Sequence, residues 1–230
     1  MKVIASMTSW SKRINQAHLT IESILNQSVV PDIIEVNLDY ENFPNGMKDL
    51  PWTMRALADN PRVQIHFNDK DLHCWEKLLP TWRAHKDDLE EWINITLDDD
   101  YQYPSNYVEL TIKAMEGHDW GCTQHNQYTM GQFMCYRSTL IEKFVDLCTD
   151  ELVLECPLDD HVIWHLIHKF DNSRCPTIDS VPKCRGTGWS FRRNFYPDVD
   201  PSTLSQGDYP KEEFIKERRY LTEHNILSKK

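Results

Sequence analysis

Long apolar runs are missing from this 230-residue sequence. No stretch approaches the roughly 20 apolar residues that a membrane-spanning helix needs. The first six residues run into the polar Thr8 and Ser9 too soon to form the apolar centre of a secretory signal. We therefore expect a cytoplasmic protein with reduced thiols and no transmembrane segment.

Paired cysteines and several catalytic motifs are also missing. The seven cysteines are an odd number without a Cys-x-x-Cys pair, which argues against a zinc knuckle or a complete disulfide framework. The absence of a Gly-x-Ser-x-Gly elbow and of a P-loop disfavours serine hydrolases and common ATPases. Gly186 and Gly188 lack the third glycine and the preceding strand of a dinucleotide site.

Basic residues are too few for a protein that grips a phosphate backbone over a wide surface. The chain has 36 acidic residues against 25 Lys and Arg, a net charge of -11. Extended nucleic-acid binding is therefore disfavoured, whereas a local basic face that accepts a modified base stays open. The 40% of hydrophobic and 11% of aromatic residues indicate a globular chain.

Short apolar runs alternate with helical patterns along the first 170 residues. This alternation is typical of βαβ units and predicts an α/β fold with a mostly parallel sheet covered on both faces. Residues 1–170 would form the core, and residues 171–230 an irregular segment that packs on it and ends in a charged helix or tail. The expected strands are 2–6, 33–38, 62–67, 92–97 and 131–136, and the expected helices 18–27, 72–82, 105–115, 138–148 and a last one from 159.

Three carboxylates, Asp98, Asp99 and Asp100, end the apolar stretch 92–97. Adjacent like charges repel, and a hard divalent ion is the usual compensation. On an extended backbone, Asp98 and Asp100 point the same way and would share one metal, while Asp99 points elsewhere. A solvent-exposed acidic turn is the alternative, but the position after a buried strand favours the metal site.

A second acidic pair, Asp159 and Asp160, opens a predicted helix after Pro157. Helix capping and a favourable dipole interaction explain such a pair. A general base for an acceptor hydroxyl is the functional alternative. His161 and His165 follow on the same helix and are read as surface residues, since the Glu of the zinc-protease motif is absent.

Several stretches together resemble GT-A glycosyltransferases of the family-2-like kind, over about residues 2–170. The Asp98–Asp100 triplet is similar to the Asp-x-Asp metal motif of that family, and Asp159-Asp160 resembles the acidic pair that supplies its base. The resemblance implies a GT-A, Rossmann-like three-layer sandwich. Its first strand and helix match residues 4–10, 13–14 and 19–28.

The resemblance implies a metal-dependent, inverting hexosyl- or pentosyltransferase with a nucleotide-diphosphate sugar, most commonly a UDP-sugar, as donor. Asp98 and Asp100 would bind Mn²⁺ or Mg²⁺, and Asp159 or Asp160 would be the catalytic base, with His161 and His165 as weak candidates for a third metal ligand. The residues expected to bind the nucleotide sugar are Ser6, Thr8, Arg13, Asp69, Lys77 and Asp99.

The acceptor and three other functions stay open. A surface-glycan precursor is the first expectation for the acceptor, and a hydroxylated nucleobase in viral DNA is an alternative. A catalytically silent nucleotide- or sugar-binding module and a metal-dependent nucleotidyltransferase are the remaining readings, because related α/β folds also hold metal and nucleotide at strand ends. Release of nucleoside diphosphate or of pyrophosphate distinguishes the two transferases.

Overall fold

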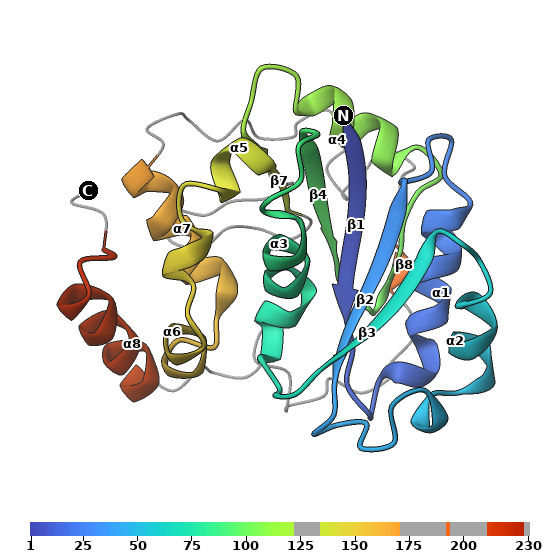
Figure 1. The fold of residues 1–230 in the computed structure, drawn as a ribbon, viewed down its shortest axis with the longest axis horizontal. Helices are drawn as coiled ribbons and strands as arrows, with labels where there is room; N and C mark the ends of the chain where they lie inside the picture. The colour runs from blue at the N-terminus through green and yellow to red at the C-terminus, as the bar shows by residue number, and fades with distance from the viewer. Residues whose placement is uncertain (122–133, 171–191, 194–210, 228–230) are drawn as a thin grey trace.

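Six strands form one sheet through the middle of the molecule (Figure 1) in the order β3-β2-β1-β4-β7-β6. The computed structural model describes residues 1–121, 134–170, 192–193 and 211–227. Strands β1 to β4 are parallel, and β7 runs antiparallel to β4 and β6. Their bounds are β1 (Lys2–Thr8), β2 (Ile33–Asp39), β3 (Val63–Asn68), β4 (Trp92–Leu97), β6 (Trp120–Gly121) and β7 (Cys135–Arg137).

Helices cover both faces of this sheet, which makes three layers (Figure 1). One face packs against α1 (Ile14–Leu25), α2 (Trp52–Leu57) and α4 (Tyr107–Ala114). The other face carries α3 (Leu79–His85), α5 (Ser138–Ile141), α6 (Asp150–Glu155), α7 (Asp159–Phe170) and α8 (Lys211–Glu223). Short 3-10 helices are η1 (Gly46–Asp49), η2 (His73–Lys77) and η3 (Val145–Leu147).

Burial explains why these residues form these elements. All six residues of β4 and the five central residues of β1 are buried, as expected for parallel strands covered on both faces. Helix α1 buries Ile14, Ala17, Ile21 and Ile24, whose spacing of three and four residues places them on one stripe. The predicted α/β architecture with a mostly parallel sheet is confirmed.

The predicted helix over 72–82 is broken in two. The structure has η2 up to Lys77, a non-helical Leu78, and then α3 from Leu79. Pro80 lies in the first turn of α3, where its missing N–H costs nothing, whereas inside a continuous helix it would remove a hydrogen bond. The apolar positions assigned to one stripe are nevertheless all buried: Leu72, Trp75, Leu78, Leu79 and Trp82.

Other differences concern short elements. The predicted helix 138–148 is α5 followed by η3, and the strand predicted at 131–136 is seen as β7, with residues 122–133 outside the described part. The six-residue helices α2 and α6 were not predicted, because they are too short to show a helical period. The segment 171–191 and residues 194–210 also lie outside the described part, while the predicted C-terminal helix is present as α8.

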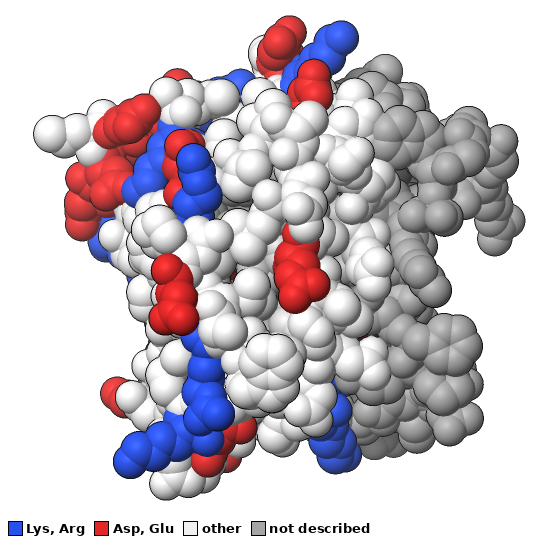
Figure 2. All heavy atoms as spheres, turned by 90° about the vertical axis from the view of Figure 1, so that its right-hand side faces the viewer, with Lys and Arg blue, Asp and Glu red and all other residues white. Residues whose placement is uncertain are grey.

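Two surface properties bear on partners. In the part of the chain that is described, no helix is both long and apolar enough to cross a membrane. On the face that carries α1 and α2, Lys and Arg side chains lie beside Asp and Glu and do not form one continuous basic patch (Figure 2).

A buried polar network joins β2 to α3. Glu35 accepts hydrogen bonds from the Thr81 hydroxyl at 2.5 Å and from His85 Nε2 at 2.8 Å, while His85 Nδ1 lies 2.8 Å from Asp88 Oδ2. Burial raises the pKa of Glu35, but the bonds from His85 and Thr81 outweigh it and lower the pKa. The bond to Glu35 raises the pKa of His85 against the effect of burial. His85 is thus held as a cation between two carboxylates.

We predict that His85→Ala lowers the free energy of unfolding by about 3 kcal/mol at pH 6, because it leaves the buried Glu35 without its cation. The Glu35–His85 ion pair contributes its full stabilisation of the fold between pH 4.5 and 6.5, the usual pKa values of Glu and His. Its contribution falls as the pH rises through the raised pKa of His85, so the difference between variant and wild type should shrink at pH 9. Urea unfolding measures both values.

Lys86→Ala is the matched control, because Lys86 is the next residue and pairs at the surface with Asp146 at 2.8 Å. An exposed pair contributes little to stability. Equal losses in the two variants, or a His85→Ala loss that does not depend on pH, would contradict the prediction.

Candidate functional site

The carboxyl ends of the parallel strands meet at one edge of the sheet. Strand pairing places Thr8 beside Asn37, Met7 beside Leu97 and Asp39 beside Asn68. The polar residues that follow these ends are therefore neighbours in space. This is the edge at which α/β sheets bind their ligands.

The Asp98–Asp100 triplet lies at this edge, in a turn rather than on an extended strand, since β4 ends at Leu97. Arg13 binds two of its members, with NH1 2.9 Å from Asp99 Oδ1 and NH2 2.6 Å from Asp100 Oδ2. The expected alternation, with Asp98 and Asp100 pointing one way and Asp99 the other, requires an extended backbone. The backbone turns here, so this expectation is wrong. Arg13 and Asp99, both predicted for the nucleotide-sugar site, do come together.

Asp99 is a buried carboxylate with several hydrogen-bond partners. Ser9 Oγ donates to Asp99 Oδ2 at 2.6 Å, and Thr20 Oγ1 donates to its backbone carbonyl at 3.0 Å. Burial raises the pKa of Asp99 to about 6, although Arg13 and Ser9 lower it. Asp99 therefore fastens the turn to α1 and to the loop after β1.

Lys77 connects the triplet to the second acidic pair. Its Nζ lies 3.9 Å from Asp98 Oδ1 and 3.2 Å from Asp159 Oδ2. Burial lowers the pKa of Lys77, but the charges of Asp159 and Asp98 outweigh it and raise the pKa, so Lys77 stays a cation. Two acidic motifs 61 positions apart in the sequence thus share one ammonium group.

Asp159 and Asp160 differ in their surroundings. Asp159 is buried and faces Lys77, and burial raises its pKa to about 6. Asp160 is half-buried and accepts the backbone N–H of His161 at 2.9 Å. Burial raises the pKa of Asp160 as well. Both lie in the first turn of α7, where the helix dipole favours a carboxylate.

The other predicted nucleotide residues have different positions. Ser6 is fully buried, where its hydroxyl donates to the carbonyl of Lys77 and accepts from Asn94 Nδ2 at 2.8 Å. Thr8 is half-buried and donates to Glu76 Oε2 at 3.0 Å. Asp69 follows β3 and is exposed. Ser6 therefore supports the backbone of Lys77, whereas Thr8 lies at the edge of the sheet.

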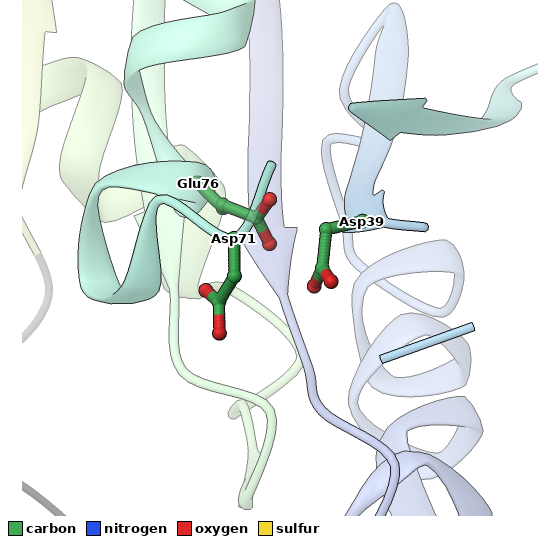
Figure 3. Close-up of side chains that lie close together, drawn as sticks. All are labelled: Asp39, Asp71 and Glu76. Carbon is green, nitrogen blue, oxygen red and sulfur yellow. The ribbon is translucent and has the colours of Figure 1, made fainter. Parts of the chain in front are cut away.

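A cluster of three carboxylates, missed from the sequence, lies at the ends of β2 and β3 (Figure 3). It consists of Asp39, Asp71 and Glu76, which each offer an oxygen within 4.8 Å of the others, and Asn42 Nδ2 donates to both aspartates at 2.9 and 3.2 Å. Burial and then the charge of Asp39 raise the pKa of Glu76 to about 8. The raised pKa of Glu76 reflects the repulsion within the cluster, which a proton or a cation would relieve.

The residues predicted to hold a metal fit a hard divalent ion by their chemistry. The Asp98 side chain is 34% exposed, and burial together with the charge of Asp100 raises its pKa against the effect of Lys77. Asp100 is already paired with Arg13, so Asp98 is the more open ligand. Mg²⁺ is commonly held by one or two carboxylates plus substrate phosphates rather than by a full protein cage.

The two histidines of α7 face each other and α8. The ring centroids of His161 and His165 are 5.1 Å apart, and His161 Nδ1 lies 3.6 Å from Glu217 Oε2. Burial lowers the pKa of His165 to about 4. His161 is itself buried, so its reading as a surface residue is wrong: α8 covers this part of α7.

An antiparallel pair of short strands adjoins the triplet. Strand β5 (Tyr101–Gln102) starts directly after Asp100 and pairs with β8 (Arg192–Arg193). The backbone of a segment far along the chain therefore returns to the candidate site. Thr20 Oγ1 also donates to the Tyr101 carbonyl at 2.7 Å, which ties this strand to α1.

Comparison with known proteins supports the fold. No family model matches the chain, and no curated protein matches its sequence. The crystal structure of TarS from S. aureus aligns with the whole chain at 11% identity and a TM-score of 0.57, although the chain covers 40% of that protein and 56% of its fragment 1–349. The 4-diphosphocytidyl-2C-methyl-D-erythritol synthase of Anaerococcus prevotii aligns over 96% of both chains at 10% identity and a TM-score of 0.51.

The chain therefore has the GT-A-type fold of nucleotide-binding transferases. This fold is shared here by TarS, a glycosyltransferase, and by a cytidylyltransferase. At 10–11% identity the likeness concerns the fold and leaves the reaction open.

We predict that Glu76→Gln removes a pH-dependent loss of stability. The folded chain binds the Glu76 proton up to a pKa of about 8, against 4.5 for an ordinary Glu. The wild type therefore loses stability between these values as the pH rises, and the Tm difference in favour of the variant should grow from pH 5 to pH 9. Each kcal/mol corresponds to about 2–4 °C in a chain of this size.

Thermal unfolding at several pH values measures this difference. Glu109→Gln, a change of the same type at an exposed position, is the control. A Tm difference for Glu76→Gln that stays constant with pH would show that the carboxyl group ionises normally in the folded chain.

Proposed function

We propose that this chain is a glycosyltransferase that moves a sugar from a nucleotide-diphosphate sugar to an acceptor hydroxyl, with inversion. The observation that carries the proposal is the position of Lys77 between Asp98 and Asp159. Such a transfer needs cationic groups for the departing diphosphate next to a carboxylate for the acceptor proton. The end of η2 supplies the cation Lys77, and the start of α7 supplies the carboxylates Asp159 and Asp160, beside the turn that follows β4.

The donor end of the site is built from Arg13, Lys77 and Asp98. Mn²⁺ or Mg²⁺ bound by Asp98, with Asp100, would supply Lewis-acid stabilisation of the charge on the nucleoside diphosphate. Lys77 is a half-buried cation held between two carboxylates beside this position, and it would stabilise developing negative charge with little reorganisation. We propose a UDP-sugar as the donor to test first.

Asp160 is the better placed of the two candidate bases. Asp159 is buried and its Oδ2 faces Lys77, so it is occupied in holding that cation. Asp160 is half-buried at the start of α7, so it is more exposed than Asp159. A raised pKa also makes its carboxylate a stronger base. We therefore assign proton acceptance to Asp160 and the positioning of Lys77 to Asp159.

A nucleotidyltransferase is the second candidate. The 4-diphosphocytidyl-2C-methyl-D-erythritol synthase shares the fold over 96% of both chains, so the fold is compatible with this reaction as well. A catalytically silent binding module is less favoured, because both acidic motifs lie together with their cations. A surface-glycan precursor is the first acceptor to test, with a hydroxylated nucleobase as the alternative.

The test of the reaction is product release from a panel of nucleotide sugars in Mn²⁺ or in EDTA. We expect nucleoside diphosphate, released only with the metal and reduced at least about 100-fold in Asp98→Asn. Asp146→Asn, at an exposed carboxylate outside the site, should match the wild type. Pyrophosphate release from a nucleoside triphosphate and a phosphorylated alcohol would instead establish nucleotidyl transfer, and no release from any donor would favour the binding module.

Substitutions of the two acidic residues of α7 should affect different kinetic constants. We predict that Asp160→Asn lowers kcat by about 100-fold or more with little change in the KM for the donor, because the proton acceptor is lost. Asp159→Asn should mainly raise the KM for the donor, because Lys77 loses its nearest partner. Steady-state kinetics with the donor that the panel identifies measure both constants. The opposite pattern would exchange the two roles.

A further inference from the structure

The C-terminal helix α8 docks beside the candidate base. Leu221 and, just beyond the helix, Ile226 are buried in the core that also contains residues of α6 and α7. Lys216 pairs with Glu155 of α6 at 2.8 Å, and Lys169 of α7 donates to the carbonyl of Asn225. These contacts attach the end of the chain to the elements on this face of the sheet.

Glu217 stands out among the docking residues, because its side chain is fully buried. A buried carboxylate is costly, and an apolar side chain of similar size would dock a helix with less desolvation. Its Oε2 lies 3.6 Å from Nδ1 of His161, whose side chain is 6% exposed. This contact with His161 links α8 to the helix that carries the proposed base.

His161 belongs to the first turn of α7. Its backbone N–H donates to Asp160 Oδ1 at 2.9 Å, and Asp159 in the same turn faces Lys77. A rotation of this turn would change the positions of both carboxylates at once. Glu217 Oε2 lies 3.6 Å from His161 Nδ1, longer than a hydrogen bond, so α8 would oppose this rotation by packing and by charge.

We infer that Glu217 is a positioning residue: through His161 it fixes the first turn of α7, and with it Asp159 and Asp160. The kinetic part of this inference rests on the proposed transfer reaction, whereas the structural part does not. The ionisable groups around Asp160 are Lys77 of η2, Asp159 and His161 of its own helix, and Glu217 of α8. Burial raises the pKa of Asp160, the charge of Lys77 lowers it, and the charge of Glu217 adds to the rise. The last residues of the chain thus act on the proposed base.

The test compares Glu217→Gln with Lys216→Met. The first change keeps the size of the side chain and removes its charge. The second removes the neighbouring surface pair with Glu155, which does not involve α7. Hydrogen exchange of a peptide spanning residues 157–165 is measured in both variants and in the wild type, with a peptide from β4 as the reference. The kcat and the KM for the donor are measured in parallel.

We expect faster exchange in the 157–165 peptide of Glu217→Gln alone, with the β4 peptide unchanged. We also expect a loss in kcat of about tenfold to a hundredfold, as small misplacements of reacting groups produce, with the KM for the donor unchanged. Exchange equal to the wild type, or a rise throughout the chain, would overturn the inference. Local exchange in a protein without turnover would reject the proposed function and leave the positioning role standing.

Discussion

Two half-buried cations, Arg13 and Lys77, hold together the carboxylates at the carboxyl edge of the sheet. Arg13 binds Asp99 and Asp100, and Lys77 lies between Asp98 and Asp159. A buried carboxylate without a partner would take up a proton or destabilise the fold. The geometry of the site therefore depends on these two side chains, and any ion or nucleotide that enters adds its charge to an arrangement that is already partly neutralised.

The backbone at Lys77 is positioned by hydrogen bonds from the central strands. The hydroxyl of Ser6 in β1 holds the backbone carbonyl of Lys77, and Asn94 of β4 donates to the same hydroxyl. Pro80 disfavours one continuous helix over this region, and η2 and α3 are separate elements. Lys77 is therefore the last residue of a short 3-10 helix near the strand ends. The central strands thus set the position of the ammonium group through the backbone.

The carboxylates in the interior of the chain are compensated in different ways. At Asp98 and Asp159 the carboxylates share a cation, whereas at Glu76 a proton or a cation would relieve the repulsion. At Glu217 the charge is buried against a histidine of the proposed catalytic helix. The net charge of -11 is therefore only partly a surface property.

The elements with a clear period were predictable from the sequence. Strand β4 has the predicted bounds, and Trp75 and Trp82 are buried as expected. The helix predicted at 18–27 is present as α1, but it begins four residues earlier, at Ile14, and ends at Leu25. These features arise from local spacing of apolar residues, which the chain carries wherever it is placed. Short helices such as α2 and α6 span less than two turns and give no such signal.

The sequence by itself determined the α/β architecture and the position of the Asp98–Asp100 and Asp159–Asp160 motifs, because apolar periodicity and strand ends are local properties. Only the tertiary structure decided which charges meet. In the turn after β4, Asp99 and Asp100 both contact Arg13. A cluster of three carboxylates from separate parts of the sequence consists of Asp39, Asp71 and Glu76. The contact of Glu217 with His161 joins residues 56 positions apart. Charge pairing acts over a few ångströms in space, and no local pattern in the sequence reports such distances.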